Sequence, residues 1–265
     1  MLCRCHTNFI STSQFQFDAT KISLCQLRDF LMAPSTQFAT EDDRQPARLG
    51  DRVYQQIKEK LIRGAYGPGD KLTVRGLAED LQVSSTPARD AINRLALEGA
   101  LVYAGPKTVI VPFLEPQALE EITLMRLALE GLAAEKATAR VTDEDIETLQ
   151  EMQLRINAAL DERRYAEALW SNKEFHFSIY KLCCMPHLLA TIETLWLRIG
   201  ASFNDLYPEF AEAKYGVHNH MAAIEGLEER DASTVRAAIE SDIRDGYRRM
   251  KHASRERNAG GPRPM

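Results

Sequence analysis

The stretch "VSSTPARDAINRLALEGALV", residues 83–102, predicts a helix with well-marked ends. Ser84 or Ser85 can cap its first turn, because a serine oxygen accepts a hydrogen bond from a main-chain N–H group that the helix leaves unpaired. Pro87 falls where its missing N–H group is tolerated. Gly99 can adopt the left-handed conformation that ends many helices. The helix therefore begins with small polar residues and stops before a β-prone run.

The two sides of this helix differ in chemistry, because residues three and four positions apart share one side. One side is apolar and is predicted to be buried: Ala88, Ile92 and Leu95. The other side is polar: Thr86, Arg89 and Asn93. In the major groove of DNA, arginine can bind guanine and asparagine can bind adenine. The polar side is therefore a candidate recognition surface, although many amphipathic helices have a polar side with no such role.

The segments around the helix extend the pattern. Helices are predicted over 51–63 and 75–81, and the runs "ALVY" and "TVIV" flank "AGPK" as a β-hairpin. The order of three helices and a two-stranded wing is that of a winged helix-turn-helix, whose third helix enters the major groove. Lys107, at the tip of the wing, can contact a phosphate. The predicted DNA-binding domain covers residues 49–112.

Composition and charge agree with this division. The chain has 265 residues, of which 45% are hydrophobic and 27% are charged, which suggests a globular protein of about two domains. The net charge of −5 argues at first against a nucleic-acid partner. Residues 50–112, however, hold nine Lys and Arg against seven Asp and Glu, whereas residues 113–250 hold fifteen against twenty-five. The basic excess lies with the predicted DNA-binding domain, and residues 113–116 form a linker.

The two ends of the chain lack a sustained period. Residues 1–48 are predicted to be a disordered extension, with Met32 as an alternative start, and residues 251–265 a basic disordered tail. No window reaches the roughly 18 consecutive apolar residues of a membrane span, and the N-terminus lacks the order of a secretory signal. The sequence therefore predicts a cytoplasmic protein with no membrane partner.

Residues 117–250 predict a second, all-helical domain of about six amphipathic segments, separated near residues 142, 161, 186, 208 and 231. Polar residues interrupt the apolar stripes of three segments: Asn172 and His176 in the third, His220 in the fifth and Asp242 in the sixth. A buried polar group without a partner costs roughly 2 kcal/mol or more. These four side chains should therefore satisfy one another, or a group between them.

Two interpretations of the four residues stay open. The first is a hydrogen-bonded network in the core. The second is a site for a divalent first-row metal of the Zn, Ni or Mn type, because two imidazoles, a carboxylate and an amide oxygen suit such an ion. Two histidines and one aspartate also occur around the metal of some oxygenases, which makes a metal-dependent enzyme an alternative. No general base or nucleophile pair accompanies the residues, so we expect no catalysis.

The first domain resembles the DNA-binding domain of the GntR family of bacterial transcription regulators. The resemblance is carried by "LIRG…PGDKL", "LAEDLQVSSTPARDAINRL" and "EGALV". It implies that four residues contact operator DNA: Arg75, Thr86, Arg89 and Gly105. The chain departs from the family at Ser85, where arginine is usual, and at Gly76, where an acidic residue is usual. One expected contact is thus shortened to a hydroxyl.

The second domain resembles the FCD ligand-binding domain of the FadR subfamily, an antiparallel helical bundle. The resemblance is carried by "EITLMRLALEGLAAEKA", "NKEFHFSIY" and "HMAAIEGLEERDASTVRAAIESDI". Metal-binding members place Asp, His, His and His at the positions of Asn172, His176, His220 and Asp242. Two of the four ligands differ here, but one carboxylate and two imidazoles are kept.

The resemblance also suggests an effector pocket near the domain junction that contains Arg126 and, as a weaker candidate, Arg198. The planar fork of Arg126 could grip a carboxylate or could pair with Glu130. Together these observations predict a repressor that binds a palindromic operator as a homodimer and responds to a small organic acid, with a metal-sensing repressor without an organic effector as the alternative.

Overall fold

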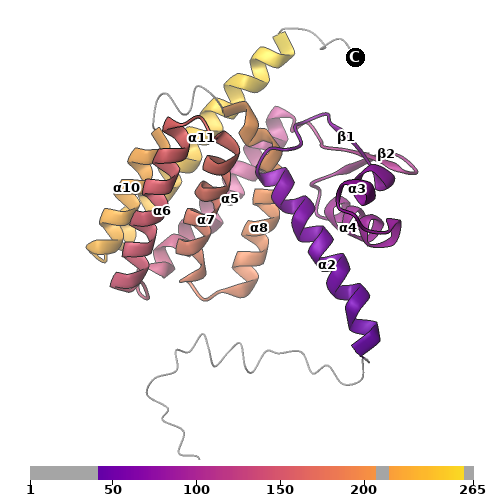
Figure 1. Ribbon diagram of the computed structural model, residues 1–265. Coiled ribbons are helices and arrows are strands. Elements are labelled where there is room, and N and C mark those ends of the chain that lie inside the picture. The colour runs from indigo at the N-terminus through magenta and orange to yellow at the C-terminus, as the bar shows by residue number, and fades with distance from the viewer. Residues whose placement is uncertain (1–40, 207–214, 260–265) are drawn as a thin grey trace, which may run out of the picture. The chain divides into compact units, whose positions relative to one another are not determined.

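The first part of the described chain has the order of elements expected for a winged helix. The computed structural model describes residues 41–206 and 215–259. Its N-terminal elements are α2 (Glu41–Ile62), β1 (Lys71–Thr73), α3 (Val74–Asp80), α4 (Ser85–Leu97), β2 (Val102–Gly105) and β3 (Thr108–Ile110). Figure 1 shows them in indigo and purple. The predicted arrangement of three helices followed by a hairpin is confirmed.

Helix α4 has the ends and the buried side that its sequence predicts. Ser84 is the extended residue before the first turn, although its hydroxyl makes no capping hydrogen bond. Gly99 has φ +78°, and the N–H group of Ala100 turns back to the carbonyl of Leu95 at 2.9 Å. The apolar side is buried, with exposures of 0–1%: Ala88, Ile92 and Leu95. The polar side is left toward solvent.

The small sheet has one strand more than the predicted hairpin. Strand β1 pairs antiparallel with β3, which places Leu72 opposite Val109 and gives the order β1-β3-β2. Both side chains are buried in the core of the DNA-binding domain. The sequence "GPGDKLT" reads as a turn because of its Gly and Pro residues, and the three-residue strand exists only because β3 supplies its hydrogen-bond partner.

Helix α2 starts earlier than predicted. Residues 41–48, which we expected to belong to a disordered extension, form its first turns, so that prediction was wrong for these residues. Residues 1–40, including the alternative start at Met32, lie outside the described residues.

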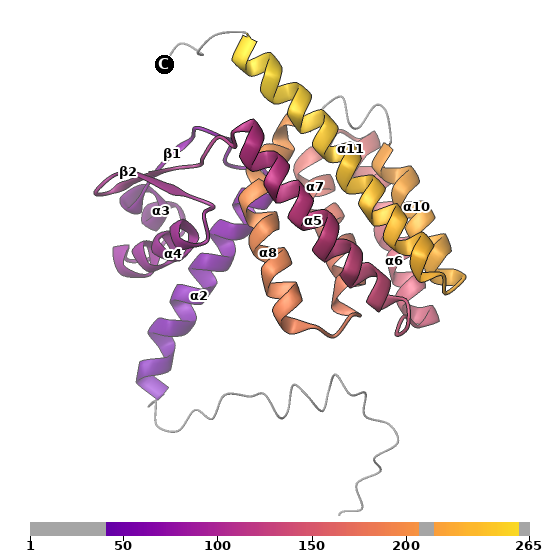
Figure 2. The ribbon, with the colours of Figure 1, turned by 180° about the vertical axis from the view of Figure 1, so that it is seen from behind.

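The second part of the described chain is helical throughout. Its elements are α5 (Pro116–Ala137), α6 (Asp143–Asp161), α7 (Tyr165–Lys181), α8 (Pro186–Gly200), the 3-10 helix η1 (Ala201–Leu206), α10 (Tyr215–Glu228) and α11 (Ala232–Ala259). The six predicted segments are thus six α-helices within the described residues; the predicted break near residue 208 lies outside them. Figure 2 shows α5 and α11 running side by side in opposite directions.

Local sequence signals explain the helix ends. Thr142 caps α6 by accepting a hydrogen bond from the N–H group of Asp145 at 3.2 Å, and the Asp145 carboxylate accepts one from the N–H group of Thr142 at 2.9 Å. Pro116 and Pro186 stand in the first turns of α5 and α8. Close packing of α5 on α11 depends on Gly131, because a Cβ atom there would lie 3.0 Å from Glu240 Oε1.

Helix α11 continues to Ala259. The expectation of a disordered tail from residue 251 was therefore wrong for residues 251–259. The segment "KHASRERNA" contains no glycine or proline, and the buried Ser254 fixes one side of it against the protein. The first strong breaker, "GGP", comes directly after the helix, and these last residues lie outside the described part of the chain.

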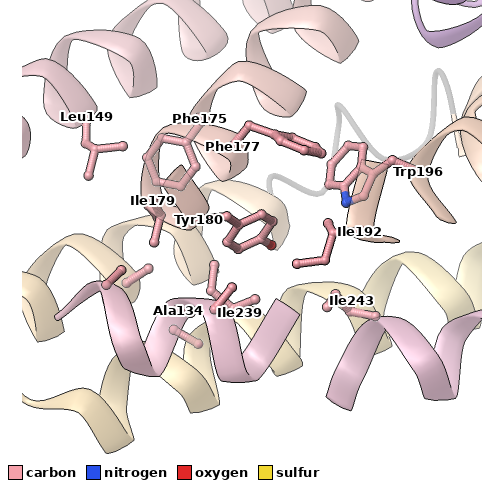
Figure 3. Packing of buried hydrophobic residues seen from close by; sticks show 14 of the residues in the cluster. Ala134, Leu149, Phe175, Phe177, Ile179, Tyr180, Ile192, Trp196, Ile239 and Ile243 are labelled. Carbon is pink, nitrogen blue, oxygen red and sulfur yellow. The ribbon is translucent and has the colours of Figure 1, made fainter. Parts of the chain in front are cut away.

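Aromatic side chains form the centre of the bundle. Phe177 of α7 packs against Trp196 of α8 and against Tyr180, with ring centres 5.6 and 5.7 Å apart. Phe175 lies in the same core, and each of these side chains is at most 2% exposed (Figure 3). Leu197 and Ala201 instead belong to the core of the DNA-binding domain. The described residues all belong to one compact unit of the chain, Ala39–Met265. Among the described helices, we find none long and apolar enough to span a membrane.

Candidate metal centre and nucleic-acid interface

The candidate recognition surface is formed by α3, α4 and the wing. Thr73 caps α3 by accepting a hydrogen bond from the N–H group of Gly76 at 3.0 Å. The predicted DNA-contacting side chains on this surface are exposed: Arg75, Ser85, Thr86, Arg89, Asn93 and Lys107. Gly105, the last residue of β2, is half-buried. The structure therefore leaves the predicted contacts accessible.

Two of these side chains already have partners within the domain. The Nε atom of Arg75 donates to Glu79 at 2.7 Å, one turn later on α3. The hydroxyl of Tyr103, on the wing strand β2, donates to Asn93 Oδ1. The amide oxygen of Asn93 is thus occupied, and its NH₂ group is the part that remains to meet a base. Arg89 lies between Thr86 and Asn93 on the exposed side of α4.

Three of the four predicted metal ligands converge from three helices. His176 of α7, His220 of α10 and Asp242 of α11 each offer one ligand atom, and these atoms lie within 4.8 Å of one another. The two Nε2 atoms are 3.1 Å apart, and His176 Nε2 is 3.3 Å from Asp242 Oδ2. Both imidazoles are buried. Asn172 lies one turn before His176 on the same side of α7 and is half-buried.

Hydrogen bonds behind the imidazoles determine where their protons lie. The Tyr180 hydroxyl donates to Glu130 Oε2 at 2.7 Å, so at 3.1 Å it accepts from His176 Nδ1. Gln153 donates its NH₂ group to Asn157, so its Oε1 accepts from His220 Nδ1 at 2.6 Å. Each ring therefore carries its proton on Nδ1 and turns the Nε2 lone pair toward the other ring.

Facing lone pairs repel each other unless something positive lies between them. One proton on His176 Nε2 could be shared with one acceptor, but two acceptor atoms lie beside it: His220 Nε2 at 3.1 Å and Asp242 Oδ2 at 3.3 Å. Asp242 Oδ1 is buried and has no hydrogen-bond partner within the described residues. A divalent cation accepts several lone pairs at once, and two imidazole nitrogens with one carboxylate are ligands that first-row metals prefer. The donor set fits such an ion.

The surroundings keep both ligand types in the required charge state. Burial lowers the pKa of His220 to about 3, with Asp242 opposing and His176 adding to the shift. Burial alone would raise the pKa of Asp242, but the neighbouring His176, His220 and Arg126 together bring that pKa below the ordinary value. At neutral pH the site therefore presents a neutral imidazole at His220 and a carboxylate at Asp242.

Of the two predicted effector-binding arginines, Arg126 lies in the bundle core. Its Nε and Nη2 atoms donate to Glu130 at 2.7 and 3.5 Å, and both side chains are almost fully buried. The guanidinium also lies 4.9 Å from the ring centre of Trp196. The predicted alternative of an ion pair with Glu130 is thus formed. Since Glu130 also accepts from Tyr180, the pair is linked to His176.

Arg198, the weaker candidate, lies at the junction of the two domains, and its role as an effector ligand stays a prediction. Its Nε atom donates to the main-chain carbonyl of Glu98 at 2.8 Å, at the end of α4. A Cβ atom at Gly99 would lie 3.0 Å from the same Nε atom. Positions 196 and 198 of a helix are about 200° apart. Trp196 therefore faces the bundle, and Arg198 faces the DNA-binding domain.

Sequence reasoning missed the residues that support the metal ligands. Gln153 interrupts the apolar stripe of Leu149 and Ile156 on α6, so the search that found His176 could have found it. Tyr180 follows His176 by four residues, but a tyrosine on an apolar stripe is usual. Trp196 gave no signal, because only the packing of α8 brings its ring 5.4 Å from the ring of His176.

A winged helix with an exposed polar recognition surface, joined to a helical bundle with a buried polar site, defines a DNA-binding regulator with a second domain. Residues 49–110 match the family described as "Bacterial regulatory proteins, gntR family", and residues 121–245 match the FCD domain. The chain belongs to the GntR family and carries an FCD domain. The fold class predicted from the sequence is confirmed.

Relatives of known type agree. The HTH-type transcriptional regulator McbR of Escherichia coli (strain K12) is 32% identical over 190 residues, which cover 71% of this chain and 86% of McbR. The Nta operon transcriptional regulator of Aminobacter aminovorans is 34% identical over 134 residues, 51% of this chain and 63% of that protein. The solved structure of E. coli McbR/YncC has a TM-score of 0.72 and 29% identity, covering 77% of this chain and 97% of that chain. These relatives are transcription regulators, and both matched domains are domains of transcription regulators and not of enzymes.

Proposed function

We propose that the protein is a repressor whose affinity for a palindromic operator is controlled at the buried site of the FCD domain. In this proposal His176, His220 and Asp242 hold a divalent metal of the Zn, Ni or Mn type, with the side chain of Asn172 beside them. The metal would supply a positive charge that attracts a small organic acid. The observation that carries the proposal is the pair of Nε2 lone pairs that face each other at 3.1 Å beside a carboxylate.

The hydrogen-bonded partners support this role. Metal-binding histidines commonly donate their second N–H group to an oxygen, which fixes the ring and its tautomer. Here His176 donates to the Tyr180 hydroxyl and His220 donates to Gln153 Oε1. Phe175 stacks on His220 with ring centres 4.1 Å apart, which further restricts the ring. The ligands are therefore held in place before a metal arrives.

Metal content tests the site directly. The protein would be purified without a histidine tag, and bound metal would be measured by elemental analysis in the wild type, in His176→Ala and in His218→Ala. His218 is the matched control, because it lies on the same helix as His220 but is exposed. We expect about one metal per chain in the wild type and in the control, and none in His176→Ala. Equal metal in all three proteins would refute the site, as would none in the wild type.

DNA binding tests the regulatory part. Operator sequences would be selected from random DNA by the protein itself, and affinity would be measured with and without metal and with added small organic acids. Coupling of about 1–3 kcal/mol, or roughly 5–150-fold in operator affinity, is typical of such switches. Affinity that follows the metal alone would favour a metal-sensing repressor. Selected sites without two symmetric halves would contradict the proposed homodimer.

Arg89 tests the recognition surface. It is exposed in the middle of the polar side of α4, so Arg89→Ala should abolish specific binding at moderate salt. Lys107→Ala, at the wing tip, removes only a proposed phosphate contact and should weaken binding to all sequences alike. Retained operator protection by Arg89→Ala would refute the assignment of α4 as the recognition helix.

A further inference from the structure

The bundle core contains a second buried polar atom without a partner. The indole Nε1 atom of Trp196 and Asp242 Oδ1 are the two buried side-chain polar atoms that lack a hydrogen-bond partner among the described residues. The Trp196 side chain is 2% exposed. Buried tryptophan N–H groups usually find an acceptor, and an exception needs a physical explanation. One donor and one acceptor are thus left over in the same core.

Asp242 belongs to the candidate metal centre, and the ring of Trp196 lies beside His176, another of its residues. The Trp196 ring lies 5.4 Å from the His176 ring, and His176 Nε2 lies 3.3 Å from the Asp242 carboxylate. Figure 3 shows the indole nitrogen on the ring edge that faces Ile192, one turn earlier on α8. The Trp196 ring is held by Phe177 and Phe203, with ring centres 5.6 and 5.5 Å away. Because this ring lies beside His176, a molecule bound next to the ligands would come within reach of Trp196.

Charge limits what that molecule can be. The Arg126 guanidinium next to the indole is already neutralised by Glu130. With two neutral imidazoles, the Asp242 carboxylate and a divalent ion, the site would carry one net positive charge. An uncompensated charge in a buried site is costly. A single negative charge would neutralise the site, whereas two would leave an excess.

We propose that the indole N–H group of Trp196 donates a hydrogen bond to an oxygen of the effector, and that the effector is a small monocarboxylate. This inference rests on the proposed function, since the carboxylate binds where the metal is held. Trp196 then determines specificity. A ligand with an acceptor oxygen at this position gains a hydrogen bond, whereas a ligand without one leaves the buried N–H group unpaired.

The test observes the indole N–H group itself. The chain has two tryptophans; Trp170, which lies against Arg63 and Lys173, serves as the internal control. Protein labelled with ¹⁵N-tryptophan would be loaded with Zn²⁺ and titrated with glycolate, acetate and succinate, and Trp170→Phe would assign the two indole signals. We expect glycolate and acetate to move the Trp196 N–H signal downfield and to leave the Trp170 signal in place, and succinate to bind more weakly.

A variant supplies the second measurement. Trp196→Phe keeps an aromatic ring but removes the donor, so affinity for the monocarboxylates should fall by about tenfold or more, while Zn²⁺ affinity, measured by competition with a chromophoric chelator, should stay unchanged. Failure to bind Zn²⁺ would refute the proposed function. Zn²⁺ binding with an unmoved Trp196 signal, or stronger binding of succinate, would overturn this inference alone.

Discussion

Replacing Arg126 by methionine is expected to destabilise the bundle strongly. Arg126 and Glu130 form an ion pair with side-chain exposures of 4% and 0%, at an Nε to Oε1 distance of 2.7 Å. Removing one partner of a buried pair leaves an uncompensated charge and typically costs about 3–5 kcal/mol. Because about 1 kcal/mol corresponds to roughly 2–4 °C for a domain of this size, Tm should fall by about 6–20 °C.

The double variant Arg126→Met with Glu130→Gln separates the ion pair from the packing of the side chains. Glutamine keeps an oxygen for the Tyr180 hydroxyl but carries no charge, so the double variant should regain more than half of the lost stability. Thermal unfolding would be followed by calorimetry at one fixed protein concentration, because oligomers unfold in a concentration-dependent way. If Arg126→Met lost less than about 1 kcal/mol, the ion pair would not be structural, and Arg126 would be better assigned to gripping the effector.

Three further perturbations follow from single contacts. The Asp231 carboxylate accepts hydrogen bonds from Ser233 and Thr234, which hold its pKa at about 2, below the ordinary 3.8. The stability that the wild type gains over Asp231→Asn should therefore be complete above about pH 5 and should disappear as pH falls from 3.8 toward 2. A difference between the two urea midpoints that does not change with pH would contradict this. Gly99→Ala forces a φ of +78° on a residue with a side chain and should cost about 1–2 kcal/mol in urea unfolding, whereas unchanged stability would show that this turn is not required. Tyr180→Phe removes the oxygen that accepts from His176 Nδ1 and should weaken metal binding about 10–100-fold in chelator competition; unchanged affinity would show that the hydroxyl does not orient the ring.

Local patterns were enough to predict much of the fold. The spacing of Ala88, Ile92 and Leu95 predicted the buried side of α4, and Gly99 marked its end, because both depend on residues close in sequence. The polar interruptions His176, His220 and Asp242 predicted a shared site, since a buried polar group needs a partner wherever the helices come from. The spacing of residues along each helix was enough to predict these features.

Contacts between distant segments could not be predicted in the same way. Strand β1 depends on pairing with β3, and its own three residues have no strand pattern. The hydrogen bond from Arg198 to the carbonyl of Glu98 could not be predicted either, because the packing of α8 determines which side Arg198 faces. The helical start of α2 and the helical end of α11 were missed because polar segments without an apolar stripe read as disordered, although they contain good helix formers.

The hydrogen bond from Tyr103 to Asn93 has a consequence for redesigning operator preference. A graft that exchanges only α4 with that of a relative would leave Tyr103 of the wing facing a residue it was not matched to, and would give the new residue 93 an orientation set by the old wing. Helix α4 and strand β2 should therefore be transplanted together, with position 103 chosen as part of the recognition surface. In a library that varies position 93 alone, Tyr103 would still restrict the orientation of each side chain placed at that position.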